Sequence, residues 1–127
     1  MEFVAIVIVL ALVQYFVFGM LVGRARGTYE VHAPAISGHP VFERYYRVHQ
    51  NTLEMIVMFI PAIVLFSYLV RPDIAAAIGA VYLVGRVIYL RAYVADPAKR
   101  GLGFMVSMLP VLVLLLGSGV AAVISLL

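Results

Sequence analysis

Cysteine is missing from the 127-residue chain, and charged residues are scarce at 12% of the total. Without cysteine there is no disulfide framework, no thiolate metal site and no cysteine nucleophile. The three histidines are irregularly spaced and have no cysteine beside them, so no metal site is predicted. Lys and Arg outnumber Asp and Glu by 9 to 6, but these charges lie at the ends of apolar runs. They form no basic stripe on a polar domain, which argues against a nucleic-acid partner.

Apolar residues fill most of the chain instead. They make up 65% of the residues, and the mean hydropathy is +1.11. An ordinary soluble domain is roughly half apolar and about a quarter charged. A small domain also leaves much of its surface exposed, so it cannot hide this many apolar side chains from water. The sequence therefore predicts an integral membrane protein whose natural surroundings are membrane lipid.

Four segments are long and apolar enough to cross a bilayer, which takes about 20 residues of helix. They are residues 3–23, 42–70, 74–95 and 101–127. The longest connection is expected from Arg24 to Val41, and Arg71-Pro72-Asp73 breaks the chain between the second and third segments. The predicted fold is all-α: one membrane domain over residues 1–127, built as a multi-pass four-helix bundle.

The distribution of basic residues predicts how this bundle sits in the membrane. Arg71 is the one basic residue at the end that carries the short second connection. Because basic residues collect near cytoplasmic helix ends, the opposite end is predicted to be cytoplasmic. In a bacterium the membrane would be the inner one. The basic residues at the predicted cytoplasmic end are Arg24, Arg26, Arg44, Arg47, Arg91, Lys99 and Arg100.

Polar residues interrupt the second and third segments at the spacing of one helix face. Ionisable residues at membrane depth usually face a bundle interior, a partner or a cavity. Because the two helices are antiparallel neighbours, their polar stripes are predicted to face each other, or a shared cleft, near the cytoplasmic surface. The first stripe is Arg47, Asn51 and Glu54; the second is Tyr82, Arg86, Tyr89 and Tyr93; Arg44, Lys99 and Arg100 surround the mouth.

Two interpretations of these stripes are open. In the structural one, Glu54 and Arg86 neutralise each other as a buried pair that fixes helix register, and the tyrosines form an interfacial belt. In the functional one, which the complete set favours, arginines fork onto ligand carboxylates while Glu54 accepts from an ammonium group. Glutathione, with two carboxylates and one α-ammonium, fits this second interpretation. A lipophilic second substrate would enter directly from the bilayer.

Two stretches carry a family resemblance. The segment from Phe42 to Glu54, FERYYRVHQNTLE, is followed by Pro61 and resembles the signature of the MAPEG family, the membrane-associated proteins in eicosanoid and glutathione metabolism. Residues 81–93, VYLVGRVIYLRAY, resemble the third-helix motif of that family. The resemblance implies a homotrimer of four-helix subunits that binds glutathione between neighbouring subunits on the cytoplasmic side.

The same resemblance assigns roles to individual residues. Arg26 and His49 match positions that reach in from the neighbouring subunit, and Arg86 matches an arginine of the third-helix motif. His49 and Met55 depart from the glutamine and tyrosine of the leukotriene synthase branch, which favours the microsomal glutathione transferase type. The positions that match glutathione contacts within one subunit are Arg47, Asn51, Glu54, Tyr89, Tyr93 and Arg100.

Transferase chemistry needs a cation that stabilises the glutathione thiolate, and three arginines are candidates. The leukotriene synthase branch has two adjacent arginines at the end of its first helix. Here the run reads Gly23-Arg24-Ala25-Arg26-Gly27, with a glycine in the slot of the second arginine. Arg26 or Arg24 would reach the sulfur from a shifted backbone, and Arg100 is the other candidate.

The leading functional prediction is therefore a membrane-bound glutathione transferase that conjugates lipophilic electrophiles, with reduction of lipid hydroperoxides as a further activity of the same thiolate. The alternative is a non-catalytic lipid-binding or lipid-presenting protein of the same fold, which would have lost the glutathione contacts. A small multidrug transporter would need a membrane-embedded carboxylate that exchanges protons. Residues 3–23 and 101–127 contain none, and Glu54 has arginines for neighbours.

Overall fold

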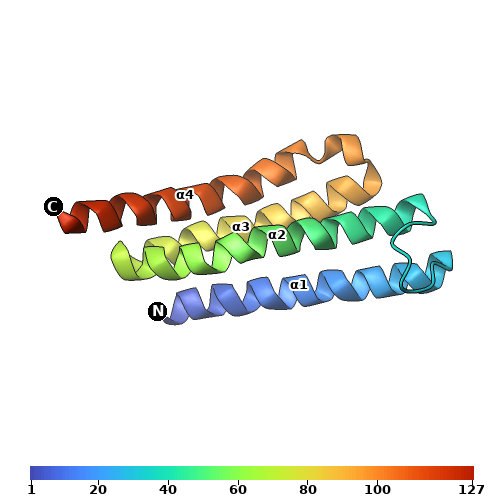
Figure 1. Cartoon of the computed structure of the whole chain (residues 1–127), viewed down its shortest axis with the longest axis horizontal. Helices are drawn as coiled ribbons and strands as arrows, with labels where there is room; N and C mark the ends of the chain where they lie inside the picture. The colour runs from blue at the N-terminus through green and yellow to red at the C-terminus, as the bar shows by residue number, and fades with distance from the viewer.

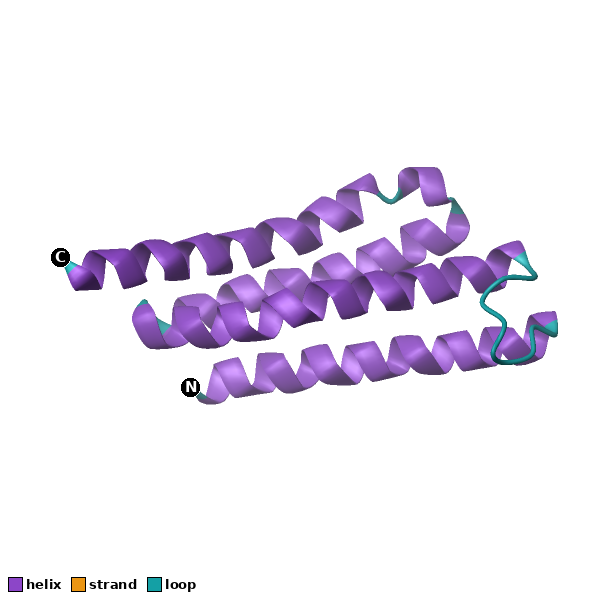
Figure 2. Ribbon diagram, viewed as in Figure 1, coloured by secondary structure: helices purple, strands orange, loops and turns teal.

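The computed structural model describes residues 1–127 as an antiparallel bundle of four long helices (Figures 1 and 2). The chain termini lie at one end of the bundle, and the long first loop lies at the other (Figure 1). All four helices are long and apolar enough to span a membrane, which confirms the predicted all-α bundle. The helices are α1 Glu2–Tyr29, α2 Pro40–Leu69, α3 Pro72–Ala95 and α4 Gly101–Leu126, with a short 3-10 turn, η1 Pro97–Lys99, before α4.

The first helix is longer than its apolar run predicts. The connection expected from Arg24 to Val41 is wrong in its first part, because α1 continues to Tyr29 and ends with Glu30 in the left-handed conformation. A membrane span ends where charge begins, but a helix satisfies its own backbone hydrogen bonds on both sides of that boundary. Alanine and arginine also favour helix, so the Arg-Ala-Arg run continues α1.

Local signals set where α2 and α3 begin. His39 caps α2 by accepting a hydrogen bond on Nδ1 from the backbone N–H of Val41 at 3.1 Å, and Pro40 occupies the first turn, where a missing N–H costs nothing. Pro72 has the same place in α3. Arg71 holds Asp73 there with two hydrogen bonds of 2.9 and 2.7 Å. The breaker predicted at this point is thus a tight connection between two antiparallel helices.

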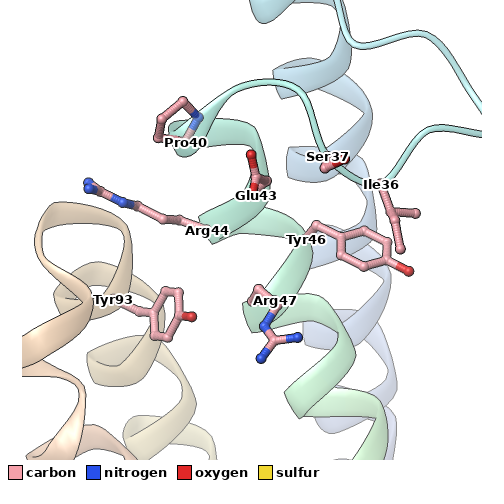
Figure 3. Close-up of a pocket in the computed structure, with 8 residues that line it drawn as sticks. All are labelled: Ile36, Ser37, Pro40, Glu43, Arg44, Tyr46, Arg47 and Tyr93. Atoms are coloured by element: carbon pink, nitrogen blue, oxygen red, sulfur yellow. The ribbon is translucent and has the colours of Figure 1, made fainter.

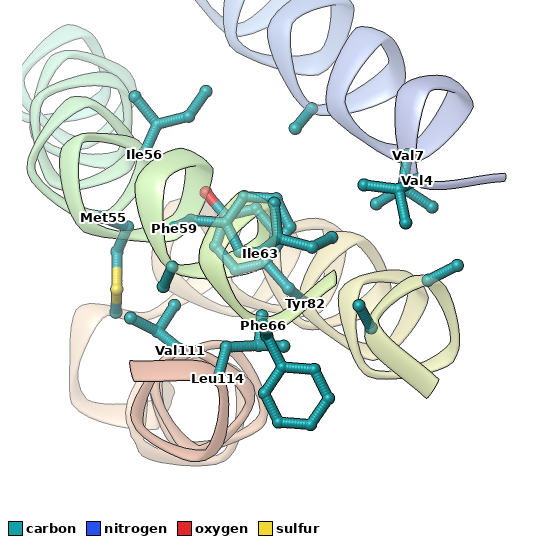
Figure 4. Packing of buried hydrophobic residues seen from close by; sticks show 14 residues of the cluster. Val4, Val7, Met55, Ile56, Phe59, Ile63, Phe66, Tyr82, Val111 and Leu114 are labelled. Atoms are coloured by element: carbon teal, nitrogen blue, oxygen red, sulfur yellow. The ribbon is translucent and has the colours of Figure 1, made fainter. Parts of the chain in front are cut away.

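The helices α2 and α3 form the middle of the bundle, with α1 packed on one side and α4 on the other (Figure 1). Figure 4 shows the buried cluster where all four helices meet, and aromatic rings from α2 and α3 fill its centre. Phe59 and Tyr82 stack there with ring centroids 3.9 Å apart. Large apolar side chains on the outer faces are left exposed, as expected for a protein surrounded by lipid.

Helix α2 is longer than a bilayer is thick. Its 30 residues span about 45 Å at ~1.5 Å per residue, whereas the hydrocarbon core is about 30 Å. The surplus lies at the end that carries the charged residues from Glu43 to Glu54. Arg44 donates from Nη1 to the backbone carbonyl of Val94 at 3.0 Å, so the polar halves of α2 and α3 meet at the same end of the bundle.

Candidate functional site

A polar cavity of about 320 Å³ opens between α2, the end of α3 and the start of α4. Ligand pockets commonly have volumes of roughly 300–1,000 Å³, so the cavity is large enough for a molecule the size of a short peptide. The cavity contains the entire first predicted stripe, two members of the second, and one basic residue predicted for the mouth. Its lining residues are Arg47, Gln50, Asn51, Glu54, Tyr89, Tyr93 and Arg100.

Helical geometry explains why these side chains converge. Arg47, Asn51 and Glu54 are spaced i, i+4, i+7 and therefore share one face of α2. Tyr89 and Tyr93 are four residues apart on α3, and their rings lie 5.5 Å apart. Arg100 comes from the turn between η1 and α4, where its Nη1 donates to the carbonyl of Pro97 at 2.9 Å. Side chains from α2, from α3 and from the turn before α4 thus line one polar site.

The charges in this cavity are not neutralised by one another. The ion pairs within the subunit join the N-terminal amine to Glu2 and Arg71 to Asp73, and both lie on exposed residues. Arg47, Arg100 and Glu54 therefore line the cavity without a mutual salt bridge. Two guanidinium groups and one carboxylate are available to a ligand that carries more negative charge than positive.

Arg86 lies elsewhere than predicted. The expectation that it lines the cleft or pairs with Glu54 is wrong, because its side chain is fully buried beneath the cavity. It donates from Nη1 to Asn51 Oδ1 at 2.7 Å and to Thr52 Oγ1 at 3.1 Å, and from Nε to Ser107 Oγ at 2.9 Å. The Arg86 side chain extends from α3 toward α2 and α4, where three neutral oxygens accept hydrogen bonds from it.

Tyr82 also departs from the predicted stripe. It is fully buried and stacks on Phe59 in the apolar core. Tyr82 lies seven residues before the cavity-lining Tyr89, which is about two helical turns, so it shares that helix face but lies at a different depth in the bundle. The second stripe therefore divides in two: Tyr89 and Tyr93 line the cavity, whereas Tyr82 and Arg86 support it from below.

A second cavity of about 530 Å³ adjoins the first toward the end of the bundle (Figure 3). Arg47 and Tyr93 line both cavities and lie across from each other, so the polar site continues outward between them (Figure 3). Its other lining residues are Ile36, Ser37, Pro40, Glu43, Arg44 and Tyr46. The sequence predicts Arg44 at the mouth, whereas Gln50, Glu43 and Tyr46 are site residues that it did not predict. For Gln50 the signal was its spacing of three residues from Arg47 and four from Glu54.

The remaining predicted residues lie outside the cavity in a single subunit. Arg26 donates from Nη1 to the carbonyl of Ala35 at 2.6 Å and to that of Val31 at 3.4 Å, and its guanidinium carbon sits 4.8 Å from the centre of the Phe42 ring. Arg24 lines a separate cavity of about 210 Å³. His49 stacks on Tyr15 of α1 with ring centroids 4.5 Å apart. Arg100 is the one predicted thiol-activating arginine that lines the cavity.

Sequence comparisons identify relatives along most of the chain. A 41% identical protein of Synechocystis, named uncharacterized protein sll1147, matches over 114 residues, 90% of this chain and 83% of that one. Human microsomal glutathione S-transferase 2 is 36% identical over 119 residues, 92% of this chain and 81% of its own. Bovine leukotriene C4 synthase is 31% identical over 83 residues, 65% of this chain and 55% of its own. The similarity is thus greater to this glutathione transferase than to this leukotriene synthase.

A sequence model of the MAPEG family matches residues 4–120, which reach from the first turn of α1 into α4 and include every residue that lines the polar cavity. This match confirms the resemblance carried by the segments at 42–54 and 81–93. With its four membrane-spanning helices and its glutathione transferase relatives, the chain belongs to the MAPEG family.

Proposed function

We propose that this protein is a membrane-bound glutathione transferase that binds glutathione in the polar cavity and conjugates it to lipophilic electrophiles. The observation that carries the proposal is the set of unpaired charges in that cavity: Arg47 and Arg100 beside Glu54, with Asn51, Tyr89 and Tyr93 around them. The microsomal glutathione S-transferase relatives support the same chemistry.

The ligand's charges correspond to those of the cavity. Glutathione carries two carboxylates and one α-ammonium, so its net charge is negative. Arg47 presents a planar fork of donors for a carboxylate, and Glu54 accepts from the ammonium. The tyrosine hydroxyls and the Asn51 amide supply neutral hydrogen bonds for the peptide groups. One carboxylate and the ammonium of the ligand thus each have an opposite charge in the cavity, and Arg100 remains for the thiolate.

Arg100 is the side chain assigned here to activate the thiol. A cysteine-type thiol has a pKa of about 8.5, so it is mostly protonated at neutral pH. Lowering that pKa by two units requires about 2.7 kcal/mol of preferential interaction with the thiolate, and a guanidinium beside the sulfur acts in this direction. Arg26 instead donates to its own loop, and Arg24 lies beside a different cavity.

The reaction balances with the thiolate as nucleophile. The thiol proton leaves to solvent, sulfur bonds to the electrophilic carbon, and the leaving group departs with its electron pair. With a lipid hydroperoxide, the thiolate attacks the terminal oxygen, the O–O bond breaks, and the alkoxide takes up a proton and leaves as the alcohol. The sulfur is left as a sulfenic acid. A second glutathione then displaces water and forms glutathione disulfide. The lipophilic partner reaches the sulfur from the bilayer.

The assembly proposed is a homotrimer, in which Arg26 and His49 approach the cavity of the neighbouring subunit. The extensive apolar surface of the isolated subunit supports contacts with lipid or with other copies. The cavity faces the cytoplasm in this proposal, because basic residues cluster at its end of the bundle. Native mass spectrometry from detergent checks the assembly. A monomer or dimer there would refute the trimer.

Ultraviolet difference titration with glutathione at neutral pH tests the function. The expected result is a saturable thiolate absorption band, which Arg100→Leu reduces and Arg71→Leu leaves intact, because Arg71 lies at the opposite end of the bundle. Calorimetric binding without the band would mean that the protein holds glutathione but does not activate it. No binding at all would overturn the proposal in favour of the non-catalytic lipid-presenting alternative.

A further inference from the structure

Arg86 is a buried cation without a counter-ion. Its side chain has no exposed surface, and no carboxylate lies within ion-pair distance of it. Burying a charge is costly unless it is paired or hydrogen-bonded, so a position of this kind demands an explanation. Three of its five N–H donors reach oxygens on α2 and α4, its guanidinium carbon lies 4.5 Å from the centre of the Tyr89 ring, and Nη2 has no partner.

The hydrogen bond to Asn51 fixes which end of that side-chain amide faces Arg86. An arginine has donors only, so the Asn51 atom 2.7 Å from its Nη1 must be the carbonyl oxygen Oδ1. The amide nitrogen Nδ2 is then the end that remains free. It makes no hydrogen bond within the subunit and is not among the buried unpartnered atoms, so its two N–H donors are open to the cavity that Asn51 lines.

The other two acceptors do not depend on Arg86 in the same way. Thr52 Oγ1 donates to the carbonyl of Val48 at 2.8 Å, and Ser107 Oγ donates to the carbonyl of Gly103 at 2.7 Å. Each hydroxyl is therefore held by its own helix. The Asn51 carboxamide has no hydrogen bond inside the subunit other than the one from Arg86. Without Arg86 it would be free to rotate and to present Oδ1, an acceptor, to the cavity.

We infer that Arg86 is a positioning residue: it holds Asn51 by Oδ1 so that the Nδ2 donors point into the cavity and bind a carboxylate or carbonyl oxygen of the ligand. This inference rests on the proposed binding of glutathione. It gives the buried charge a role that direct ligand contact cannot, since Arg86 has no surface in the cavity. A polar site keeps its specificity when its donors are oriented before the ligand arrives.

A double-mutant cycle tests the coupling, with glutathione affinity measured by titration calorimetry on detergent-purified protein. The variants are R86M, N51A and the R86M/N51A double variant, with T52V as the matched control because Thr52 accepts from the same Nη1 atom but faces the interior. Hydrogen bonds to charged ligand groups justify an expected loss of about 10-fold to 100-fold for R86M and for N51A. In the N51A background, R86M should cost less than about 3-fold more, and T52V should stay within about 3-fold of wild type.

Further variants separate positioning from charge and from folding. N51D keeps an oxygen toward Arg86 but removes both donors, so affinity should fall at least as far as in N51A. R86M should melt close to the wild-type temperature, because it removes an unpaired buried charge while the Thr52 and Ser107 hydroxyls keep the hydrogen bonds to their own helices. If R86M does not fold, N51D carries the test, because it leaves Arg86 and its charge in place and removes only the two donors.

The outcomes are distinct. Equal losses from R86M in the wild-type and N51A backgrounds would mean that Arg86 acts by charge alone, and would overturn the inference while leaving glutathione binding in place. Retained affinity in N51D would also overturn it, because the donors would then be unnecessary. Failure of the wild-type protein to bind glutathione would refute the proposed function and this inference together.

Discussion

The Cβ atom that Gly85 lacks would lie 2.6 Å from the backbone nitrogen of Ser107, so α3 and α4 meet backbone to backbone at this level. Gly103 of α4 has the same relationship to the backbone of Tyr89. Small residues permit such close approach between membrane helices. The contact brings Ser107 within hydrogen-bonding distance of Arg86 and places α4 beside the tyrosines of the cavity.

Gly85→Ala should therefore destabilise the bundle, since the added methyl group has only backbone and the Ser107 side chain to displace. We expect a loss of about 1–3 kcal/mol, the usual cost of overpacking, together with weaker glutathione binding. Gly23→Ala is the control, because nothing lies within 4 Å of the added atom. Thermal unfolding in detergent measures both. Equal melting temperatures for the two variants would contradict the tight α3–α4 contact.

Arg100→Leu should move the pH dependence of conjugation to higher pH. With the cation present, the pKa of the bound thiol is depressed and the thiolate persists down to pH values below 7. Without it, that pKa returns toward about 8.5, so the rate at pH 7 falls by about 20-fold and recovers as the pH rises to 9. Steady-state rates with an aryl halide electrophile between pH 6 and 9 provide the measurement. An unchanged profile would exclude Arg100 as the activating group.

Glu54→Gln should weaken glutathione about tenfold, because a neutral amide replaces the carboxylate that accepts from the α-ammonium. A glutathione analogue without the amino group is the matched ligand control, and the substitution should leave its affinity nearly unchanged. Calorimetry with both ligands compares the two losses. Equal losses would show that Glu54 does not face the ammonium.

Arg26→Leu should loosen the loop between α1 and α2. Arg26 bonds the carbonyls of Val31 and Ala35 and lies over the Phe42 ring. Loss of hydrogen bonds from a charged donor costs about 1.5–3 kcal/mol, so amides of residues 31–39 should exchange with solvent about ten times faster or more. Arg24→Leu is the control, since no hydrogen bond from Arg24's side chain holds this loop. Unaltered amide exchange in Arg26→Leu would show that Arg26 does not hold this loop.

The four spans and the α2 face of the site were predictable from sequence. Lipid is a uniform solvent that demands about 20 apolar residues of helix, so hydropathy alone locates the spans. The helical repeat then places Arg47, Asn51 and Glu54 on one face whatever the rest of the fold does. The family followed from the same segment, and the match over residues 4–120 confirms it.

The tertiary structure decided which neighbours those side chains meet. Periodicity gives the direction of Arg86 around α3, but its depth and its partners depend on how closely α4 approaches through Gly85 and Gly103. Tyr82 likewise stacks on Phe59 in the core, a contact set by the packing of α3 against α2. Arg26 binds its own loop because α1 continues to Tyr29, past the end of the apolar run. The sequence determines which side chains each helix face carries, because that depends only on local helix geometry. Packing between helices determines which of these side chains line the cavity and which are buried and hold the cavity-lining residues in place.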